Sequence, residues 1–183
     1  MNISTAGILK LQQLEGISLK PYRDAGGLWT IGIGHLIKPG EENLMKGITD
    51  EQAHTLFVKD LVPFVQRVNR YINVDLTQNQ FDALVAWDFN TGRIHNSTLA
   101  EYSFAEMINN RESMQRIFQW WSSNYIKAGG KVIPGLVKRR NIEAAMFTGL
   151  VPAPGSGPVG NVLRVAIGAG LLYALYKHGS RSR

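Results

Sequence analysis

Two carboxylates and a hydroxyl lie close together near the start of the chain, in the segment from Glu15 to His35. Eight residues separate Glu15 from Asp24, and Thr30 follows Asp24 after five more. Hydrolysis of a glycosidic bond needs one carboxylic acid on the leaving oxygen and a second carboxylate on the other side of the sugar. The spacing is compatible with the catalytic hairpin of a glycosidase, in which Thr30 could help to hold a water. On spacing alone, an ordinary hairpin with a glutamate at a helix end and an aspartate in a turn is favoured.

Glu15 stands at the end of a predicted helix. Ile8, Leu11 and Leu14 recur at steps of three before it, and Gly16 is a typical helix stop. The last turn of a helix lies at the negative end of its macrodipole, where a charged carboxylate is disfavoured. If water is also excluded, this position favours a protonated acid that can donate to a leaving oxygen.

Asp24 opens an Asp-Ala-Gly-Gly sequence, which predicts the turn of a hairpin. The following strand alternates, and we expect its large apolar side chains to pack on the core: Trp29, Ile31 and Ile33. Thr30 falls on the opposite face, where glycines would let a bulky ligand approach the backbone.

Length and composition limit the classes of site that the chain can hold. Its 183 residues suit one domain of about 150 residues with an extension. The absence of cysteine excludes disulfides, thiolate metal sites and a cysteine nucleophile. The four histidines are far apart and show no ligand spacing, so we expect neither a metal nor a cofactor.

The net charge of +6 is unevenly distributed. Residues 1–150 contain sixteen basic and fourteen acidic residues, whereas residues 151–183 contain four basic residues and no acid. A nucleic-acid-binding domain would need a basic surface of its own, so we expect no nucleic-acid partner. A basic tail suits anionic wall polymers or lipid headgroups.

Periodicity and capping signals predict an α+β fold, mostly helical, with a small N-terminal β-hairpin lobe at 17–37, a long connecting helix and a helical C-terminal lobe. Pro63 should kink or split the long helix. We expect six helices. The first covers 4–15, the second runs from the capping box at 49–52 to residue 72, and the third runs from the capping box at 77–80 to about residue 92. The last three cover 98–109, 112–124 and the segment that begins at residue 134.

The hairpin segment resembles the active-site segment of the T-even phage lysozyme family. The matching residues are Glu15-Gly16, Leu19-Lys20, Tyr22, Asp24, and Thr30 through Leu36. The resemblance implies a lysozyme-like fold in which Glu15 is the proton donor. It also implies that Asp24 activates or positions water with Thr30 as its partner, and that the reaction inverts the anomeric centre.

Three later segments also resemble this family, and they imply positions that contact the glycan. The segments are Phe89-Asn90-x-Gly92, Ser97-Thr98-Leu99 and Pro134 through Arg140, and the implied contacts are Leu36, Phe89, Thr98 and Asn124. Asn124 depends only on an Asn-x-x-Lys match.

Several of these residues also have a structural interpretation. Phe89 by itself indicates a core residue that touches the cleft, and at least one of Trp120 and Trp121 should be in the core. The run Lys138-Arg139-Arg140 predicts a solvated helix face, with recognition of anionic wall groups as the alternative.

The composition changes after Leu150, which divides the chain into a catalytic domain at 1–150, a Pro/Gly linker at 151–158 and a tail at 159–183. Residues 159–176 are apolar except for Asn161 and Arg164, and basic residues follow them. We expect an apolar helix that anchors to or disrupts a membrane. A helix docked on the domain and a disordered tail are the alternatives.

The family resemblance, together with the two carboxylates, implies a muramidase that hydrolyses the β-1,4 bond between N-acetylmuramic acid and N-acetylglucosamine in peptidoglycan glycan strands. We expect its catalytic domain to be a monomer. The resemblance implies a phage-encoded protein that acts at the cell wall during lysis or entry. The N-terminus has no signal-peptide pattern, so we expect this protein in the host cytoplasm or in the virion before it acts. The alternatives are a catalytically silent wall-binding module, a lytic transglycosylase, and a basic protein acting on nucleic acid or membrane.

Overall fold

A computed structural model describes residues 1–24, 26–95, 98–99, 102–152 and 162–164. For Thr98, Leu99, Tyr102, 151–152 and 162–164 it describes the backbone but not the side chains.

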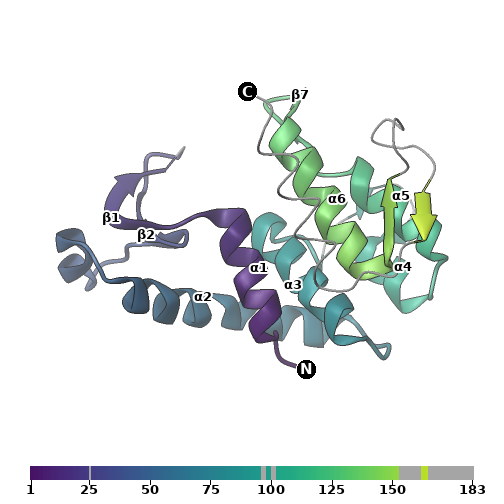
Figure 1. Ribbon diagram of the computed structural model, residues 1–183, viewed down its shortest axis with the longest axis horizontal. Coiled ribbons are helices and arrows are strands. Elements are labelled where there is room, and N and C mark those ends of the chain that lie inside the picture. Colours follow the sequence, from purple (N-terminus) through teal and green to yellow (C-terminus); the bar gives the residue numbers. More distant parts are fainter. Residues whose placement is uncertain (25, 96–97, 100–101, 153–161, 165–183) are drawn as a thin grey trace.

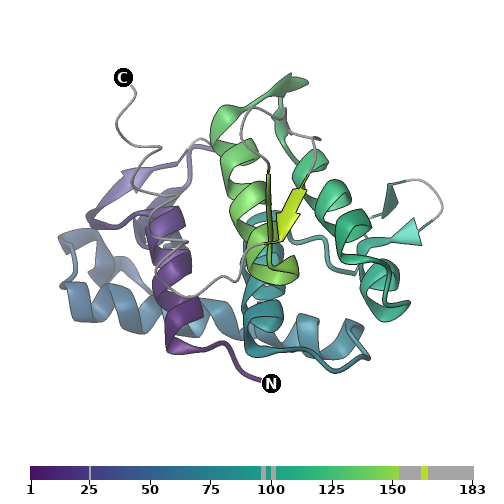
Figure 2. The same cartoon turned by 45° about the vertical axis from the view of Figure 1, so that its right-hand side comes forward.

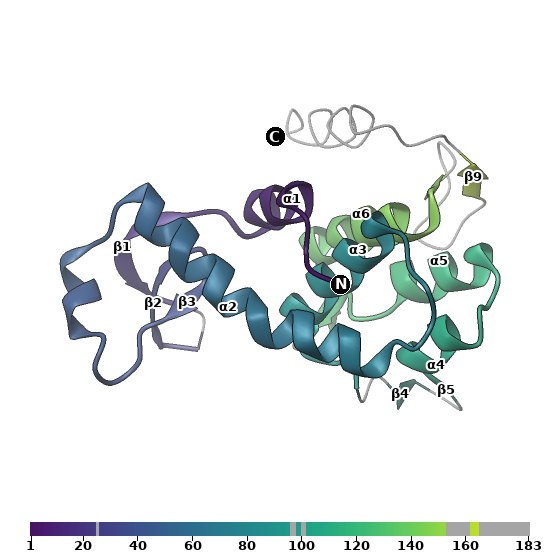
Figure 3. The same ribbon diagram turned by 90° about the horizontal axis from the view of Figure 1, so that it is seen from below.

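The N-terminal half forms a small β-lobe between two helices (Figure 1). The first helix is α1 (Thr5–Glu15), and an antiparallel sheet of order β1-β2-β3 follows it. Its strands are β1 (Ser18–Arg23), β2 (Trp29–Gly32) and β3 (His35–Leu36). After the 3-10 helix η1 (Glu42–Lys46), the helix α2 (Asp50–Tyr71) runs from this lobe to the second one (Figure 3).

The second lobe consists of helices with short β-hairpins between them. Its helices are α3 (Gln78–Thr91), α4 (Phe104–Asn109), α5 (Met114–Ser123) and α6 (Pro134–Thr148). Its strands are β4 (Thr98–Leu99), β5 (Tyr102–Ser103), β6 (Lys127–Ala128), β7 (Lys131–Val132), β8 (Leu150–Pro152) and β9 (Val162–Arg164), paired in sequence order. The expected mostly helical α+β fold is confirmed.

The predicted helix ends are confirmed where the signals are local. The Ser4 hydroxyl accepts from the backbone N–H of Gly7, and Thr49 and Thr77 each form the reciprocal capping box with a glutamine three residues later. These side chains satisfy N–H groups that have no partner within the helix. Pro63 lies on the exposed side of α2 and does not split the helix.

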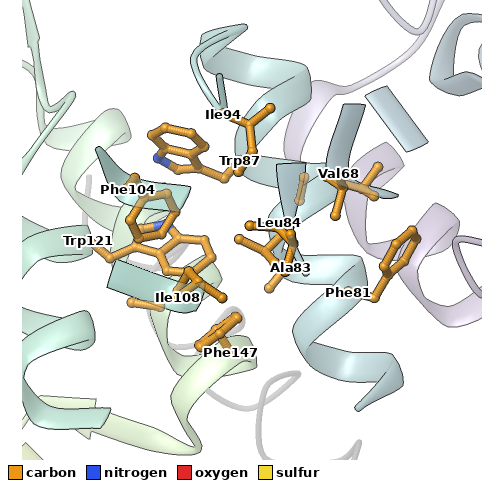
Figure 4. Close-up of a cluster of buried hydrophobic side chains, with 14 of the residues drawn as sticks. Val68, Phe81, Ala83, Leu84, Trp87, Ile94, Phe104, Ile108, Trp121 and Phe147 are labelled. Atoms are coloured by element: carbon orange, nitrogen blue, oxygen red, sulfur yellow. The ribbon is translucent and has the colours of Figure 1, made fainter. Parts of the chain in front are cut away.

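The second lobe is built around α3, most of which is buried. Trp87 on α3 is fully buried, with its ring centroid 4.7 Å from that of Phe104 and 6.4 Å from that of Trp121 (Figure 4). Trp121 is fully buried, whereas Trp120 is partly exposed and stacks on Phe104. The prediction that at least one of the adjacent tryptophans belongs to the core is confirmed.

The β-hairpins change two of the expected helices. The helix expected at 98–109 begins only at Phe104, because β4 and β5 pair before it and Ser103 caps the shorter helix. The tail helix expected from residue 159 is wrong at Val162–Arg164, because these residues pair with Leu150–Pro152 beside α6 (Figure 2). The rest of the expected linker and tail, 153–161 and 165–183, lies outside the described residues. None of the helices within the described ranges is long and apolar enough to cross a membrane.

A buried histidine connects the β-lobe to α2. His35, only 4% exposed, has Nδ1 2.8 Å from Asp60 Oδ2 on α2 and Nε2 3.1 Å from Glu41 Oε2. Glu41 also accepts a hydrogen bond from the backbone N–H of Lys38 at 2.9 Å. This backbone hydrogen bond, with the contact to His35, lowers the pKa of Glu41 below its usual range, although burial opposes the shift.

The contact between α1 and α3 leads to a prediction about two glycines. A Cβ added at Gly7 would lie 2.6 Å from Cγ and 2.9 Å from Cβ of Asp82, whereas one added at Gly135 in α6 would meet nothing within 4 Å. We expect Gly7→Ala to lower the free energy of unfolding by about 1–3 kcal/mol through overpacking. Gly135→Ala should raise it by up to about 1 kcal/mol through the loss of backbone entropy in the unfolded chain. Urea unfolding of both variants checks this, and equal effects would contradict it.

The Glu41 contacts predict a change in pH dependence. A carboxylate with a lowered folded-state pKa stabilises the fold above its unfolded-state pKa, and this contribution disappears as the pH falls through the folded-state value. We therefore expect Glu41→Gln to unfold at a lower temperature than the wild type at pH 7, with the difference shrinking below about pH 4.5. Thermal unfolding between pH 3 and 7 measures it, and a difference that is constant with pH would exclude the interpretation.

Candidate active site

Glu15 ends α1 and faces the last helix of the second lobe. Gly16, with φ of 76°, terminates α1, and its N–H donates to the carbonyl of Gln12. Glu15 Oε1 lies 2.6 Å from Nη1 of Arg139 on α6, and the two side chains are 20% and 8% exposed. The atoms form a close ion pair, although the N–H groups of Arg139 are not aligned for a hydrogen bond to Oε1. The contact joins residues 124 positions apart in the chain.

The prediction that Lys138-Arg139-Arg140 forms a solvated face is wrong for its two arginines. Arg139 is 7% exposed and Arg140 is fully buried. Both contact the fully buried Glu143, which lies three and four residues later on the same helix. Positions three and four apart lie on one face of a helix, so this spacing was the signal in the sequence that could have indicated the ion pairs.

Asp24 forms the predicted hairpin turn. Its Oδ1 accepts hydrogen bonds from the backbone N–H groups of Gly26 and Leu28, both at 2.9 Å, and its own carbonyl accepts from Gly27. These bonds fix the orientation of the carboxylate. Both of these bonds are to Oδ1, and no hydrogen bond to Oδ2 is found among the described residues.

Thr30 lies in β2 opposite Tyr22 on one side and Leu36 on the other. Its side chain is 3% exposed, and its hydroxyl donates to the carbonyl of Leu28 at 3.3 Å. The Leu28 N–H donates to Asp24 Oδ1, so the peptide groups of Leu28 connect the two predicted site residues. The structure therefore brings Asp24 and Thr30 together in one hairpin.

The two faces of strand β2 differ from the predicted alternation of buried and open side chains at two places. Ile31 and Ile33 are buried as predicted, but Trp29 is 38% exposed, and the guanidinium of Arg23 lies 4.2 Å from the centre of its ring. Thr30 and Gly32 are buried instead of open, and Ala53 of α2 packs close to Gly32. Gly32 has a φ of 66°, which ends the regular alternation of the strand.

The four predicted glycan contacts are distributed over both lobes. Leu36 is 43% exposed and adjacent to Thr30, so it belongs to the same part of the sheet as the candidate site. Phe89 is partly buried, with its ring 5.5 Å from Phe57 and 4.9 Å from Phe64, which confirms the core interpretation. Asn124 caps α5 and donates to the carbonyl of Trp120. The backbone of Thr98 lies in β4, and its side chain is outside the described part.

A groove of about 530 Å³ lies between α1, α3 and α6. Glu15, Asp24 and Thr30 are not among the residues that line it. The candidate site is instead marked by the two carboxylates, Glu15 beside Arg139 and Asp24 in the hairpin turn.

Comparison with known proteins identifies the family to which the chain is related. The phage lysozyme family model matches residues 12–143. The endolysin of Bacillus phage B103 is 38% identical over 151 residues, covering 80% of this chain but 54% of that protein. The endolysin of Acyrthosiphon pisum secondary endosymbiont phage 1 is 34% identical over 149 residues, covering 80% of this chain and 98% of that protein. This chain spans about half the length of the first relative and nearly all of the second.

A solved structure shows the same architecture. The endolysin from Escherichia coli O157:H7 phage FAHEc1 superposes with a TM-score of 0.63 at 32% identity, covering 80% of this chain and 93% of that one. The residues of the family match include Glu15 at the end of α1, Asp24 and Thr30 in the hairpin, and Arg139 and Glu143 in α6. The chain belongs to the phage lysozyme family.

Proposed function

We propose that the protein is a muramidase that hydrolyses the β-1,4 bond between N-acetylmuramic acid and N-acetylglucosamine in peptidoglycan. The observation that carries the proposal is the arrangement of two carboxylates with different partners. Glu15 is held by a guanidinium at a helix end, whereas Asp24 is oriented by two backbone N–H groups and connected to Thr30. Separate environments for two carboxylates allow separate roles in one reaction.

Glu15 is the general acid and transfers its proton to the leaving oxygen as the glycosidic bond breaks. Asp24 takes a proton from the water that attacks the anomeric carbon, through Oδ2. The Thr30 hydroxyl donates to the carbonyl of Leu28, so its lone pairs can accept a hydrogen bond from that water. Attack from the side opposite the leaving oxygen inverts the anomeric centre.

We propose that Leu36, Phe89, Thr98 and Asn124 contact the glycan strand. Leu36 is supported by its exposure and by its position opposite Thr30. Phe89 can do so only with the part of its ring that its aromatic neighbours leave exposed. Each of these positions is tested by the change in KM when its side chain is shortened.

The relatives support a role in lysis of the host, because both are named endolysins. We propose that the protein reaches the wall from the host cytoplasm or from a virion, and that its catalytic domain acts as a monomer. Asp24 and Thr30 are both present and positioned by hydrogen bonds, which favours an enzyme over a silent wall-binding module.

We propose that the apolar tail associates with membrane. The pairing of Val162–Arg164 with β8 leaves residues 165–176 as the uninterrupted apolar run. Twelve residues in a helix extend about 18 Å, which is less than the roughly 30 Å hydrocarbon core of a bilayer. While β9 is formed, the tail would therefore enter one leaflet and not span the bilayer, with its basic end near anionic headgroups.

The catalytic assignment predicts that Glu15→Gln lowers kcat by about 10²–10⁴-fold, because glutamine is nearly isosteric but has no acidic proton to donate. Glu112→Gln, which removes an exposed ion pair with Arg116, should have wild-type activity. Digestion of purified peptidoglycan followed by mass spectrometry should show new reducing-end muramic acid with the wild type and the Glu112 variant only.

Other products would decide between the alternatives. Anhydro-muramic ends would identify a lytic transglycosylase and remove the role of Asp24. Binding to peptidoglycan without cleavage by the wild type would favour the silent wall-binding module. Turnover by Glu15→Gln at the wild-type rate would overturn the assignment of the acid.

The tail proposal predicts that the full chain floats with vesicles containing phosphatidylglycerol and that a chain ending at Arg164 does not. This truncation keeps β9 and removes the apolar run with its basic end. Vesicles of phosphatidylcholine alone distinguish apolar insertion from attraction to anionic headgroups. Equal flotation of both chains would exclude the tail as the membrane-binding element.

A further inference from the structure

Glu143 is a fully buried carboxylate that the proposed reaction does not use. We propose that Glu143 is a positioning residue for Glu15, acting through Arg139. This inference rests on the proposed function, because it assigns a partner to the acid in that reaction.

Both oxygens of Glu143 are occupied. Oε1 accepts from Nε of Arg139 at 2.9 Å. Oε2 lies 2.9 Å from Nη1 of Arg140 and accepts from Nε1 of the buried Trp121 at 3.2 Å. The carboxylate is thus held in one position between α6 and the aromatic core of the second lobe.

Glu143 fixes the arginine that contacts the acid. The Arg139 guanidinium is held at Nε by Glu143 and at Nη2 by the carbonyl of Ala86 on α3, at 3.3 Å. The remaining nitrogen, Nη1, is the atom 2.6 Å from Glu15. A planar guanidinium fixed at two of its nitrogens presents the third in a defined direction. The position of Nη1 beside Glu15 therefore depends on Glu143.

Charge gives Glu143 a second effect on Glu15. The cluster contains two guanidiniums, Arg139 and Arg140, and two carboxylates, Glu15 and Glu143. The polar Asn90 of α3 contacts Arg140 as well. Burial lowers the pKa of Arg140, Glu143 and Glu15 oppose this shift, and the charge of Arg139 adds to it.

Without the charge of Glu143, Glu15 would be the only carboxylate facing two arginines. Their field would favour its ionised form, which cannot donate a proton. Glu143 therefore offsets part of the positive charge beside Glu15. A purely structural ion pair would affect only the stability of the fold.

The pH profile of kcat separates the two roles. We expect Glu143→Gln to move the alkaline limb of the profile to lower pH by about one unit, with about tenfold lower kcat on that limb and little change in KM. Glu112→Gln removes the same charge from an exposed position of the same lobe, and its profile should match the wild type. Activity is measured on labelled peptidoglycan at temperatures where circular dichroism shows each variant folded.

Glu143→Asp keeps a carboxylate beside Arg140, so it provides a folded variant if the glutamine leaves two buried arginines unbalanced. Its shorter side chain loosens the contact with Arg139 Nε, and we expect a smaller shift in the same direction. A wild-type alkaline limb in the folded variants overturns the inference while the proposed function stands. A wild type that does not hydrolyse peptidoglycan overturns the proposed function itself.

Discussion

The ion pair between Glu15 and Arg139 connects the two ends of the folded domain. It joins the end of the first helix, α1, to the last helix, α6, and both side chains are mostly shielded from water. A charge withdrawn from water needs a partner, because an unpaired one costs several kcal/mol. The second lobe must therefore be complete, with α6 in place, before Glu15 has its native surroundings. Formation of the site depends in this way on the last part of the domain to be synthesised.

The helix that bears Glu15 is fixed at both ends by residues of the second lobe. At its start, the buried Asp82 of α3 accepts a hydrogen bond from the backbone N–H of Ser4 at 3.0 Å and packs against Gly7. At its end, Arg139 of α6 holds Glu15. Helix α1 thus belongs structurally to the second lobe, although it precedes the β-lobe in the sequence, while Asp24 and Thr30 belong to the hairpin. The proposed acid and the proposed water-positioning groups come from different units of the fold.

Most of the fold and the hairpin could be predicted because their signals are local. Capping boxes at Thr49 and Thr77 and the turn at Asp24 depend on residues within a few positions of one another. The burial of Arg139 and the strand at Val162–Arg164 were missed because their partners lie far along the chain or because composition suggested another structure. The strand pattern predicts an open face at Thr30 and Gly32, and periodicity alone could not show that Ala53 of α2 packs close to Gly32. Periodicity places residues on a face of an element but does not tell which other element packs there.

The hairpin of β8 and β9 has a mechanical consequence. Leu150, which follows α6, pairs with Arg164, which precedes the tail. The connection to α6 and the connection to the tail therefore lie at the same end of the hairpin. A pulling force on the tail would load the Leu150–Arg164 pair first and peel the strands apart one residue at a time, as in a zipper. Each step breaks few hydrogen bonds, so β9 would detach at a low force, before α6 and its arginines were disturbed. Strand β9 is therefore expected to separate first under tension on the chain beyond Arg164, before the helices of the second lobe.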